Sequence, residues 1–315
     1  MKIIILDKST LGEDIDLSPI YALGETIEYE TTDETQIIER ICDADVVVVN
    51  KIKLNKENLP YAKKIKLICV AATGYDNIDT QYCKQNSIAV CNVPGYSTES
   101  VAQISVSLAL YLVNKLGEYT EFVKNGSYTA SGVANRLTPV YHEQSSLTWG
   151  VVGGGGIGTR VAEIAKAMGF SVLVCRRKKE GKFPLADIDT LVEKCDIISL
   201  HVPLNDSTRN LINKERIAKM KQTAILVNTA RGAVTDEQAL ADAVLNGEIG
   251  GLGVDVYSVE PFCEEHPFNK ILNLKNVLLT PHMAWGSFES RNRCVCEIAK
   301  NIESYFKNQQ RNKVV

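Results

Sequence analysis

One glycine-rich segment near the middle of the chain restricts its fold more than any other feature. The apolar run Leu147–Val152 leads into GGGGIG at positions 153–158, and an amphipathic stretch, Thr159–Met168, follows. The pattern G-x-G-x-x-G between a strand and a helix permits a tight turn and lets amides at the helix N-terminus approach a pyrophosphate. The segment therefore predicts a dinucleotide-binding turn, with a glycine-rich turn used only for close packing as the alternative.

Short apolar, β-branched runs alternate with helix-period segments along the whole chain. Runs that are apolar throughout, such as Val46–Val49, are typical of parallel strands buried on both faces. Strands and helices that alternate in this way form βαβ units, so the fold class is α/β with one or two doubly wound parallel sheets. The expected strands are Lys2–Leu6, Thr26–Tyr29, Val46–Val49, Leu67–Val70, Ile88–Cys91, Leu147–Val152, Ser171–Cys175, Ile197–Leu200, Ala224–Asn228, Gly251–Asp255 and Val277–Leu279.

Two helices can be delimited in more detail. Apolar residues recur at helical spacing from Val101 to Leu116, which predicts one long helix over that range. The residues from Thr235 to Gln238 have the spacing of a capping box, which places the start of a second helix at Thr235. Gly247 is expected to close that helix about three turns later.

The charge and the apolar pattern exclude several classes of protein. A net charge of -3 provides no basic field to hold nucleic acid or anionic lipid. No apolar run is long enough to predict a membrane span. The apolar N-terminal run stops at Asp7, which is too early for a signal-peptide core and is better explained by a first buried strand.

The nine cysteines indicate a reducing compartment. Their number is odd and several lie inside apolar runs, as Cys69 does, so we interpret them mostly as small buried hydrophobic residues. Cys294 and Cys296 lack a second Cys or His pair at zinc-like spacing, so no metal site is expected. The expected location is the cytoplasm.

The choice of dinucleotide is indicated at the end of the strand Ser171–Cys175. An NAD-preferring site normally has an acidic residue there, which accepts hydrogen bonds from the ribose hydroxyls. This chain instead has Arg176 and Arg177, then Lys178 and Lys179. A guanidinium suits a 2′-phosphate, so NADP is the expected cofactor and NAD the second possibility. The alternative is a solvated basic turn.

Three polar residues follow three of the later strands. Arg231 comes after Ala224–Asn228, Glu260 after Gly251–Asp255, and His282 after Val277–Leu279. Doubly wound sheets bind ligands at the carboxyl edge of their strands. Each residue alone has a plain structural explanation: a surface arginine, an acid at a helix start, a core histidine. Together at one edge they form the set that reduction of a 2-keto acid requires.

With these segments the sequence resembles the D-isomer-specific 2-hydroxyacid dehydrogenase family, and the resemblance extends from about Asp45 to Lys307. The segment Thr280–Trp285 is most similar to the branch of glycerate dehydrogenases and hydroxypyruvate or glyoxylate reductases. Tyr128 departs from the family, where tryptophan is usual, and Gln103-Ile104 lacks a polar residue common in that branch. The motifs that carry the resemblance are Ala72–Asp79, Asn92–Tyr96, Ser100–Ala102, His201–Leu204 with Thr208, and the segments around Arg231, Glu260 and His282.

The resemblance implies a role for each matching residue. His282 would be the general acid in reduction and the base in oxidation, Glu260 would orient it and favour imidazolium, and Arg231 would bind the substrate carboxylate. Asp255 would accept from the nicotinamide carboxamide. Residues implied to line the cofactor are Gly153, Gly155, Gly156, Ile157, Gly158, Arg176, Arg177, Val202, Pro203, Thr208, Thr229, Ala230, Asp255 and Ala284. Residues implied to surround the substrate are Asn50, Thr73, Gly74, Tyr75 and Trp285.

The resemblance also implies the layout of the chain. A Rossmann dinucleotide domain at 101–284 would be inserted in a flavodoxin-like substrate domain formed by 1–100 and 285–315, and the cleft between them would close on substrate. The active molecule would be a homodimer that reduces a small 2-keto acid, such as hydroxypyruvate or glyoxylate, to the D-2-hydroxy acid. Two alternatives stay open: a cofactor-sensing regulatory protein on the same scaffold, and a reductase for bulkier 2-keto acids.

Overall fold

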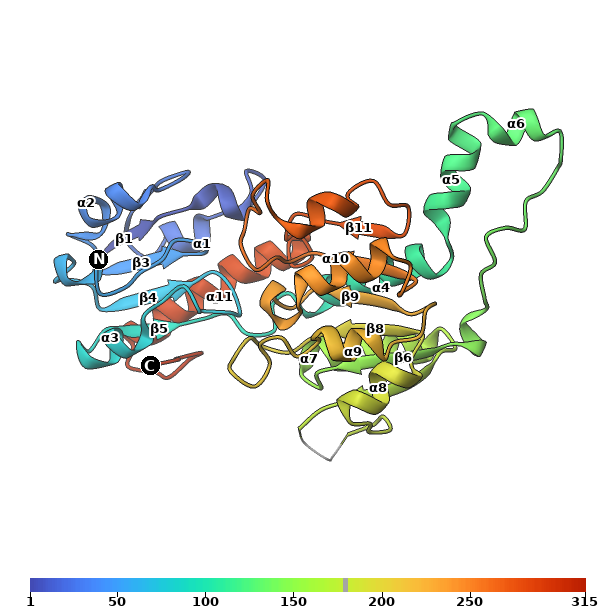
Figure 1. The fold of residues 1–315 in the computed structure, drawn as a ribbon. Helices are drawn as coiled ribbons and strands as arrows, with labels where there is room; N and C mark the ends of the chain where they lie inside the picture. Colours follow the sequence, from blue (N-terminus) through green and yellow to red (C-terminus); the bar gives the residue numbers. More distant parts are fainter. Residues whose placement is uncertain (178–180) are drawn as a thin grey trace. The chain divides into compact units, whose positions relative to one another are not determined.

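The chain divides into two compact units in a computed structural model that describes residues 1–177 and 181–315. Unit 1 consists of Met1–Ser97 and Trp285–Val315, and unit 2 consists of Thr98–Ala284. Unit 2 is therefore an insertion in the sequence of unit 1. Figure 1 shows the elements of each unit. In the described ranges, no helix has both the length and the apolar composition needed to cross a bilayer.

Unit 1 is a five-stranded parallel sheet with helices on both faces. The strand order is β2-β1-β3-β4-β5. Successive residues of β1 and β3 point to opposite faces, so Ile3 and Val46 join one apolar core, and Ile4 and Val47 join the other. The strands are β1 (Lys2–Ile5), β2 (Glu25–Glu28), β3 (Val46–Val49), β4 (Leu67–Val70) and β5 (Ala89–Cys91). The helices are η1 (Lys8–Leu11), α1 (Ser18–Tyr21), η2 (Glu34–Gln36), α2 (Ile37–Ile41), η3 (Leu59–Tyr61), α3 (Thr80–Gln85) and α11 (Phe288–Phe306).

Unit 2 is a six-stranded parallel sheet in the order β11-β10-β9-β8-β6-β7. Its strands are β6 (Thr148–Val152), β7 (Ser171–Cys175), β8 (Ile197–Leu200), β9 (Ile225–Asn228), β10 (Gly251–Val254) and β11 (Val277–Leu279). Its helices are α4 (Thr98–Val113), α5 (Leu116–Lys124), α6 (Ser127–Ser131), η4 (Gln144–Ser146), α7 (Gly156–Ala167), α8 (Ile188–Lys194), α9 (Lys214–Ala218), η5 (Gly232–Val234), α10 (Glu237–Leu245) and η6 (Pro267–Ile271).

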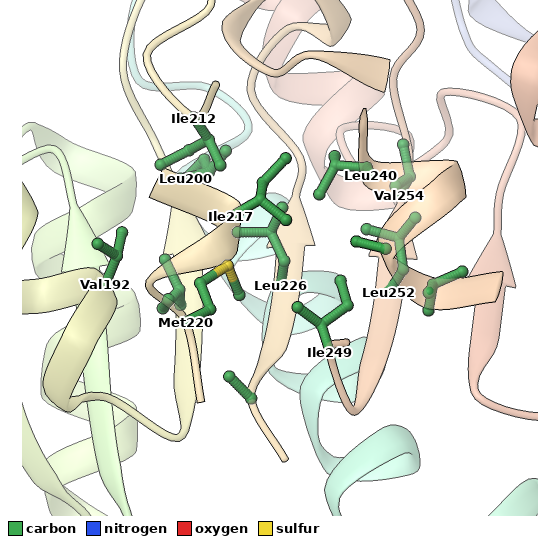
Figure 2. Packing of buried hydrophobic residues seen from close by; sticks show 14 of the residues in the cluster. Val192, Leu200, Ile212, Ile217, Met220, Leu226, Leu240, Ile249, Leu252 and Val254 are labelled. Atoms are coloured by element: carbon green, nitrogen blue, oxygen red, sulfur yellow. The ribbon is translucent and has the colours of Figure 1, made fainter. Parts of the chain in front are cut away.

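Two apolar cores hold the sheet of unit 2, one on each face. On one face, Leu108 of α4 and Val161 of α7 pack with residues of β6 and β9. On the other face, Leu191, Ile217 and Leu240 come from α8, α9 and α10. Figure 2 shows part of this second core, where helix residues meet Leu226, Leu252 and Val254 of the strands. Burial of both faces agrees with the mostly apolar sequences of these strands.

The expected fold class is confirmed. Each of the eleven expected strands is a strand of one of the two sheets, and no strand end departs from its expected position by more than one residue. All the neighbouring strands pair in parallel. Short apolar or β-branched runs bounded by polar or turn residues were therefore an adequate signal for the parallel strands of this chain.

The expectation of one helix from Val101 to Leu116 is wrong at its C-terminal end. Helix α4 ends at Val113, Lys115 adopts a left-handed backbone conformation (φ 54), and α5 begins at Leu116. The spacing that linked Leu116 to the helix was coincidental, because its side chain is 46% exposed and does not continue the buried face.

The N-cap of the second expected helix lies one residue later than the capping-box spacing predicted. Asp236 is the N-cap of α10, and its carboxylate accepts a hydrogen bond from the Ala239 amide at 3.0 Å. Thr235 instead donates its hydroxyl to the carbonyl of Gly232 at 3.0 Å and so closes the preceding 3-10 turn. Gly247 does end the helix, in the left-handed conformation (φ 69) that glycine adopts without strain.

Candidate active site

The carboxyl edge of the sheet of unit 2 carries the three expected catalytic residues. Arg231 follows β9, Glu260 lies in the segment after β10, and His282 lies three residues after β11. Because β9, β10 and β11 are parallel neighbours, the segments that leave their carboxyl ends start side by side.

Glu260 and His282 form a hydrogen-bonded pair. The Nδ1 atom of His282 lies 2.6 Å from Oε2 of Glu260, and Oε1 of Glu260 accepts from the Tyr257 amide at 3.0 Å. The two carboxylate oxygens therefore have different partners, which fixes the plane of the group. A carboxylate accepts only, so Nδ1 carries the hydrogen, and proton exchange with a ligand would use Nε2. His282 also has a left-handed backbone (φ 53), a conformation that residues other than glycine adopt at a cost in free energy.

Asp255 holds the turn that presents His282. Its carboxylate accepts hydrogen bonds from the Thr280 hydroxyl at 2.6 Å and from the amides of Met283 and Ala284, both at 2.9 Å. Burial raises the pKa of Asp255, which is 1% exposed, and these hydrogen bonds oppose the rise. The sequence assigned Asp255 to the nicotinamide only, so this structural role was missed.

The turn after β9 shapes the backbone at Arg231. Buried Asn228 donates to the carbonyl of Arg231 at 2.9 Å and accepts from the amide of Ala230 at 3.0 Å. At Gly232 a side chain would collide with the backbone of Tyr257 and Ser258. Glycine at 232 therefore lets the turn of Arg231 lie against the segment that leads to Glu260, a close approach that no sequence pattern had indicated.

The glycine-rich turn has the shape that a dinucleotide phosphate requires. Gly153 adopts φ 113, and a side chain at Gly158 would overlap the carbonyl oxygen of Gly153. Gly155 is the N-cap of α7, and no side chain caps the helix there. A Cβ atom built on Gly155 meets no atom within 4 Å, so the space beside it is open. An open cradle at an uncapped helix N-terminus fits a pyrophosphate group.

Arg176 lies beside this turn, and its guanidinium has a partner within the protein. Both terminal nitrogens lie 3.3 Å from the carbonyl oxygen of Phe183. The side chain also fills the space at Gly154, where a Cβ atom would lie 2.7 Å from Cδ of Arg176. Arg177 is exposed. Lys178 and Lys179, the rest of the basic run, fall outside the described residues.

His201, which follows β8, provides a contrast with His282. Its Nε2 atom lies 3.0 Å from the Ser199 hydroxyl, which also accepts from the Trp149 ring nitrogen at 2.9 Å. Burial lowers the pKa of His201 to about 3, so its ring stays neutral near neutral pH. The backbone of His201 packs directly against the glycine turn. A side chain at Gly153 would collide with the carbonyl oxygen of His201.

The other expected cofactor residues also follow strands of unit 2. The Thr208 hydroxyl donates to the carbonyl of Pro203 at 2.6 Å and so tightens the segment after β8, which includes Val202. The Thr229 hydroxyl lies 2.8 Å from that of buried Ser105 on α4. Gly156 and Ile157 open α7, Ala230 follows β9, and Ala284 ends the unit.

The expected substrate residues lie in unit 1. Asn50 follows β3, is buried, and donates its side-chain amide to Thr10 at 3.0 Å, while its backbone amide donates to buried Asp7. After β4, the Thr73 hydroxyl donates to a backbone carbonyl at 3.0 Å, and Gly74 and exposed Tyr75 follow. Trp285 makes an edge contact with Tyr96, with ring centroids 6.3 Å apart. In the described ranges, no three His, Cys, Asp or Glu side chains form a group suited to a metal ion.

Comparison with known proteins places these features in a family context. Residues 106–284 match the family described as D-isomer specific 2-hydroxyacid dehydrogenase, NAD binding domain. A hydroxypyruvate reductase of Blautia hydrogenotrophica is 34% identical, over 98% of this chain and 97% of its own. A glycerate dehydrogenase of Methylorubrum extorquens is 33% identical, over 99% of this chain and 98% of its own. The solved structure of an acyclic imino acid reductase with NADPH and D-Arg is 31% identical and superposes with a TM-score of 0.87, covering 100% of both chains.

Two glycine substitutions separate a packing role from a binding role in the turn. We expect Gly155→Ala to keep the melting temperature of the parent, since its φ of -77 suits any residue and its Cβ meets no atom. The new methyl group would occupy the cradle and weaken dinucleotide binding by about tenfold or more. Gly158→Ala should lower the melting temperature, because its Cβ overlaps backbone. Thermal melting and fluorescence titration with NADH and NADPH measure both effects, and parent-like binding by Gly155→Ala would contradict the assignment.

Proposed function

The chain belongs to the D-isomer-specific 2-hydroxyacid dehydrogenase family, and on that premise we propose that it reduces small 2-keto acids, such as hydroxypyruvate or glyoxylate, to D-2-hydroxy acids with NADPH or NADH. The observation that carries the proposal is the pair of Glu260 and His282, with 2.6 Å between Oε2 and Nδ1, on the sheet edge that also holds Arg231. A regulatory protein that only senses the cofactor would not need this pair.

His282 is the proton donor of the proposed reaction. A reduced nicotinamide, when bound, supplies the hydride for C2 of the keto acid. The oxygen on C2 then gains negative charge, and Nε2 of His282 delivers a proton to it. Glu260 holds the ring through Nδ1 and stabilises the imidazolium that must form before each reduction. In the reverse direction the same nitrogen removes the hydroxyl proton.

Arg231 is the proposed ligand of the substrate carboxylate. Its guanidinium can bind two carboxylate oxygens at once and also polarise the keto oxygen. Backbone amides near Thr73 and Gly74 are proposed as further ligands of the same carboxylate. Asn50, Tyr75 and Trp285 are proposed to select a small side chain on the substrate over a bulky one.

NADPH is the proposed preferred cofactor. The chain has Arg176 where an acid that prefers NAD would stand, and Arg177 follows it. Arg176 lies beside the glycine turn with its guanidinium next to the Phe183 carbonyl. A 2′-phosphate would compete with that carbonyl for the same donors, and its charge makes it the stronger acceptor.

A homodimer is proposed as the active form, formed through the apolar surface of α5, α6 and the residues that follow. Helix α5 buries none of its residues within the chain, and in Figure 1 α5 and α6 stand away from the sheet of unit 2. A patch of this kind is typical of an interface. Its exposed apolar residues are Leu116, Val123, Tyr128, Val133, Leu137, Val140 and Tyr141. We also propose a cytoplasmic location, since all nine cysteines are free thiols.

The proposed reaction and cofactor preference can be tested together. Oxidation of NADPH and NADH is followed by absorbance with hydroxypyruvate, glyoxylate and phenylpyruvate as acceptors. We expect turnover of the two small acids, with a higher kcat/KM for NADPH. Arg176→Ala should raise KM for NADPH more than KM for NADH, because the loss of its contacts with Phe183 and the glycine turn affects both cofactors but only NADPH also loses a partner for the 2′-phosphate. A preference for NADH would contradict the role of Arg176, and tight cofactor binding without any turnover would favour the regulatory protein.

The role of His282 is tested by His282→Ala. We expect kcat for reduction to fall by about 10²- to 10⁴-fold, because the keto oxygen loses its proton donor. The dissociation constant of NADPH, measured by fluorescence, should stay as in the parent. Glu260→Gln, which keeps an acceptor for Nδ1 but removes the charge, should give a smaller fall. Parent-like turnover by His282→Ala would exclude the mechanism.

The proposed dimer predicts a mass in solution of twice 34.7 kDa. Sedimentation equilibrium at micromolar concentration measures it. The double substitution Leu137→Asp and Val140→Asp should give monomers, because it places charge in the apolar surface. A parent protein that sediments as a monomer would refute the dimer without bearing on the catalytic proposal.

A further inference from the structure

Glu237, the first residue of α10, is a buried carboxylate that contacts the segment leading to Glu260. It is 9% exposed. Its Oε1 atom accepts from the Ser258 amide at 2.9 Å, and Oε2 accepts from the Ser258 hydroxyl. Glu237 lies 21 residues before Ser258, so these bonds fix a long-range contact between α10 and the segment after β10.

His266 completes the surroundings of Glu237. Its Nε2 atom lies 3.1 Å from Oε2 of Glu237, and its Nδ1 atom accepts from the Phe268 amide at 3.3 Å. An acceptor at Nδ1 places the hydrogen on Nε2, so His266 donates to Glu237. The ring is 7% exposed and packs against Tyr257, Phe262 and Phe268. Glu237 therefore receives three hydrogen bonds, and the N-terminus of α10 adds a favourable field for its charge.

The contacts of Ser258 reach the catalytic pair through its neighbour Tyr257. The amide of Tyr257 donates to Oε1 of Glu260 at 3.0 Å, and Oε2 of Glu260 faces His282. On the other side, Gly232 packs so closely that any side chain there would collide with the backbone of residues 257 and 258. The turn from 257 to 260 is thus hydrogen-bonded to Glu237 on one side and packs against the turn that carries Arg231 on the other.

We propose that Glu237 is a positioning residue for the pair of Glu260 and His282, an inference that rests on the proposed function. Removal of its carboxylate would leave the amide and hydroxyl of Ser258 and Nε2 of His266 buried without an acceptor. The turn must then move to find new partners, and the Tyr257 amide that orients Glu260 moves with it. A displacement of about 1 Å at a catalytic group is enough to slow a reaction by about 100-fold.

The test compares Glu237→Ala with a matched control on the next residue, Asp236→Ala. Asp236 caps the same helix end, where its carboxylate accepts from the Ala239 amide, and among the described residues its side chain makes no other hydrogen bond; its loss therefore weakens α10 without removing a contact of Ser258. We expect both variants to lower the melting temperature. Only Glu237→Ala should lower kcat, by about 10- to 100-fold, with KM and the dissociation constant of NADPH nearly unchanged. Glu237→Gln, which keeps one oxygen for the Ser258 amide, should recover part of the loss.

A second readout needs no substrate. The chain has four histidines, so nitrogen NMR of ¹⁵N-histidine protein can report the tautomer of His282, assigned with His282→Asn. At alkaline pH the parent and Asp236→Ala should hold the hydrogen on Nδ1, which faces the Glu260 carboxylate; Asp255 is a further carboxylate that interacts with His282. Glu237→Ala should give a mixture of tautomers.

Either of two results would overturn the inference: an unchanged His282 tautomer with parent-like kcat in Glu237→Ala, or equal effects from Asp236→Ala. If Glu237→Ala fails to fold, Ser258→Ala removes only the hydroxyl contact, and its effects on kcat and tautomer should be smaller and in the same direction. A parent-like Ser258→Ala would then count against the inference. A parent protein without turnover that still shows the expected tautomers would refute the proposed function and leave the positioning of His282 by Glu237 intact.

Discussion

The parallel pairing of β9, β10 and β11 is the constraint on which the candidate site depends. Parallel strands need long connections, and each connection here leaves the sheet at the same edge. Residues far apart in the sequence, from Arg231 to His282, are brought to that edge by the parallel pairing of their strands. Because the strands are buried on both faces, a shift of one residue in register would exchange side chains between the two apolar cores and disrupt the packing of both. The register that stabilises unit 2 therefore also fixes where the polar segments begin.

Buried carboxylates then turn these segments into fixed shapes. Asp255 binds the turn of His282, Glu237 binds the turn before Glu260, and Asp7 in unit 1 accepts from the amides of residues 50–52. Burial raises the pKa of Asp7 and Asp255, and the amides that surround each carboxylate oppose the rise. An irregular segment has no regular partners for its amides, so one buried anion that accepts several of them specifies a single conformation.

The sequence predicted the strands well because their signal is local. A short run of β-branched residues between polar residues, as in Val46–Val49, indicates a buried parallel strand from the local sequence, whereas the apolar residues of α4 recur at helical spacing over a longer stretch. The sequence predicted the ends of helices less reliably. Leu116 has the spacing of the buried residues of α4, yet its side chain is exposed and lies outside that helix. Thr235 has the spacing of a capping box, yet the N-cap of α10 is Asp236. The motifs of the sequence named candidate residues for the site, and their roles stay a prediction. The bond from Glu237 to Ser258 could not, because nothing in either residue indicates a partner 21 positions away.

The two histidines at the edge of this sheet show why residue type alone does not define a catalytic group. Both follow a strand of unit 2, and both were conspicuous in the sequence. His201 has a hydroxyl as its partner and an environment that lowers its pKa to about 3, so it cannot deliver a proton near neutral pH. His282 has a carboxylate as its partner, itself oriented by a backbone amide, which is the arrangement that the proposed proton donor requires. The difference lies in the neighbours that each segment acquires when it folds. Burial keeps the ring of His201 neutral, whereas a carboxylate 2.6 Å from Nδ1 gives His282 the partner that the proposed proton donor requires.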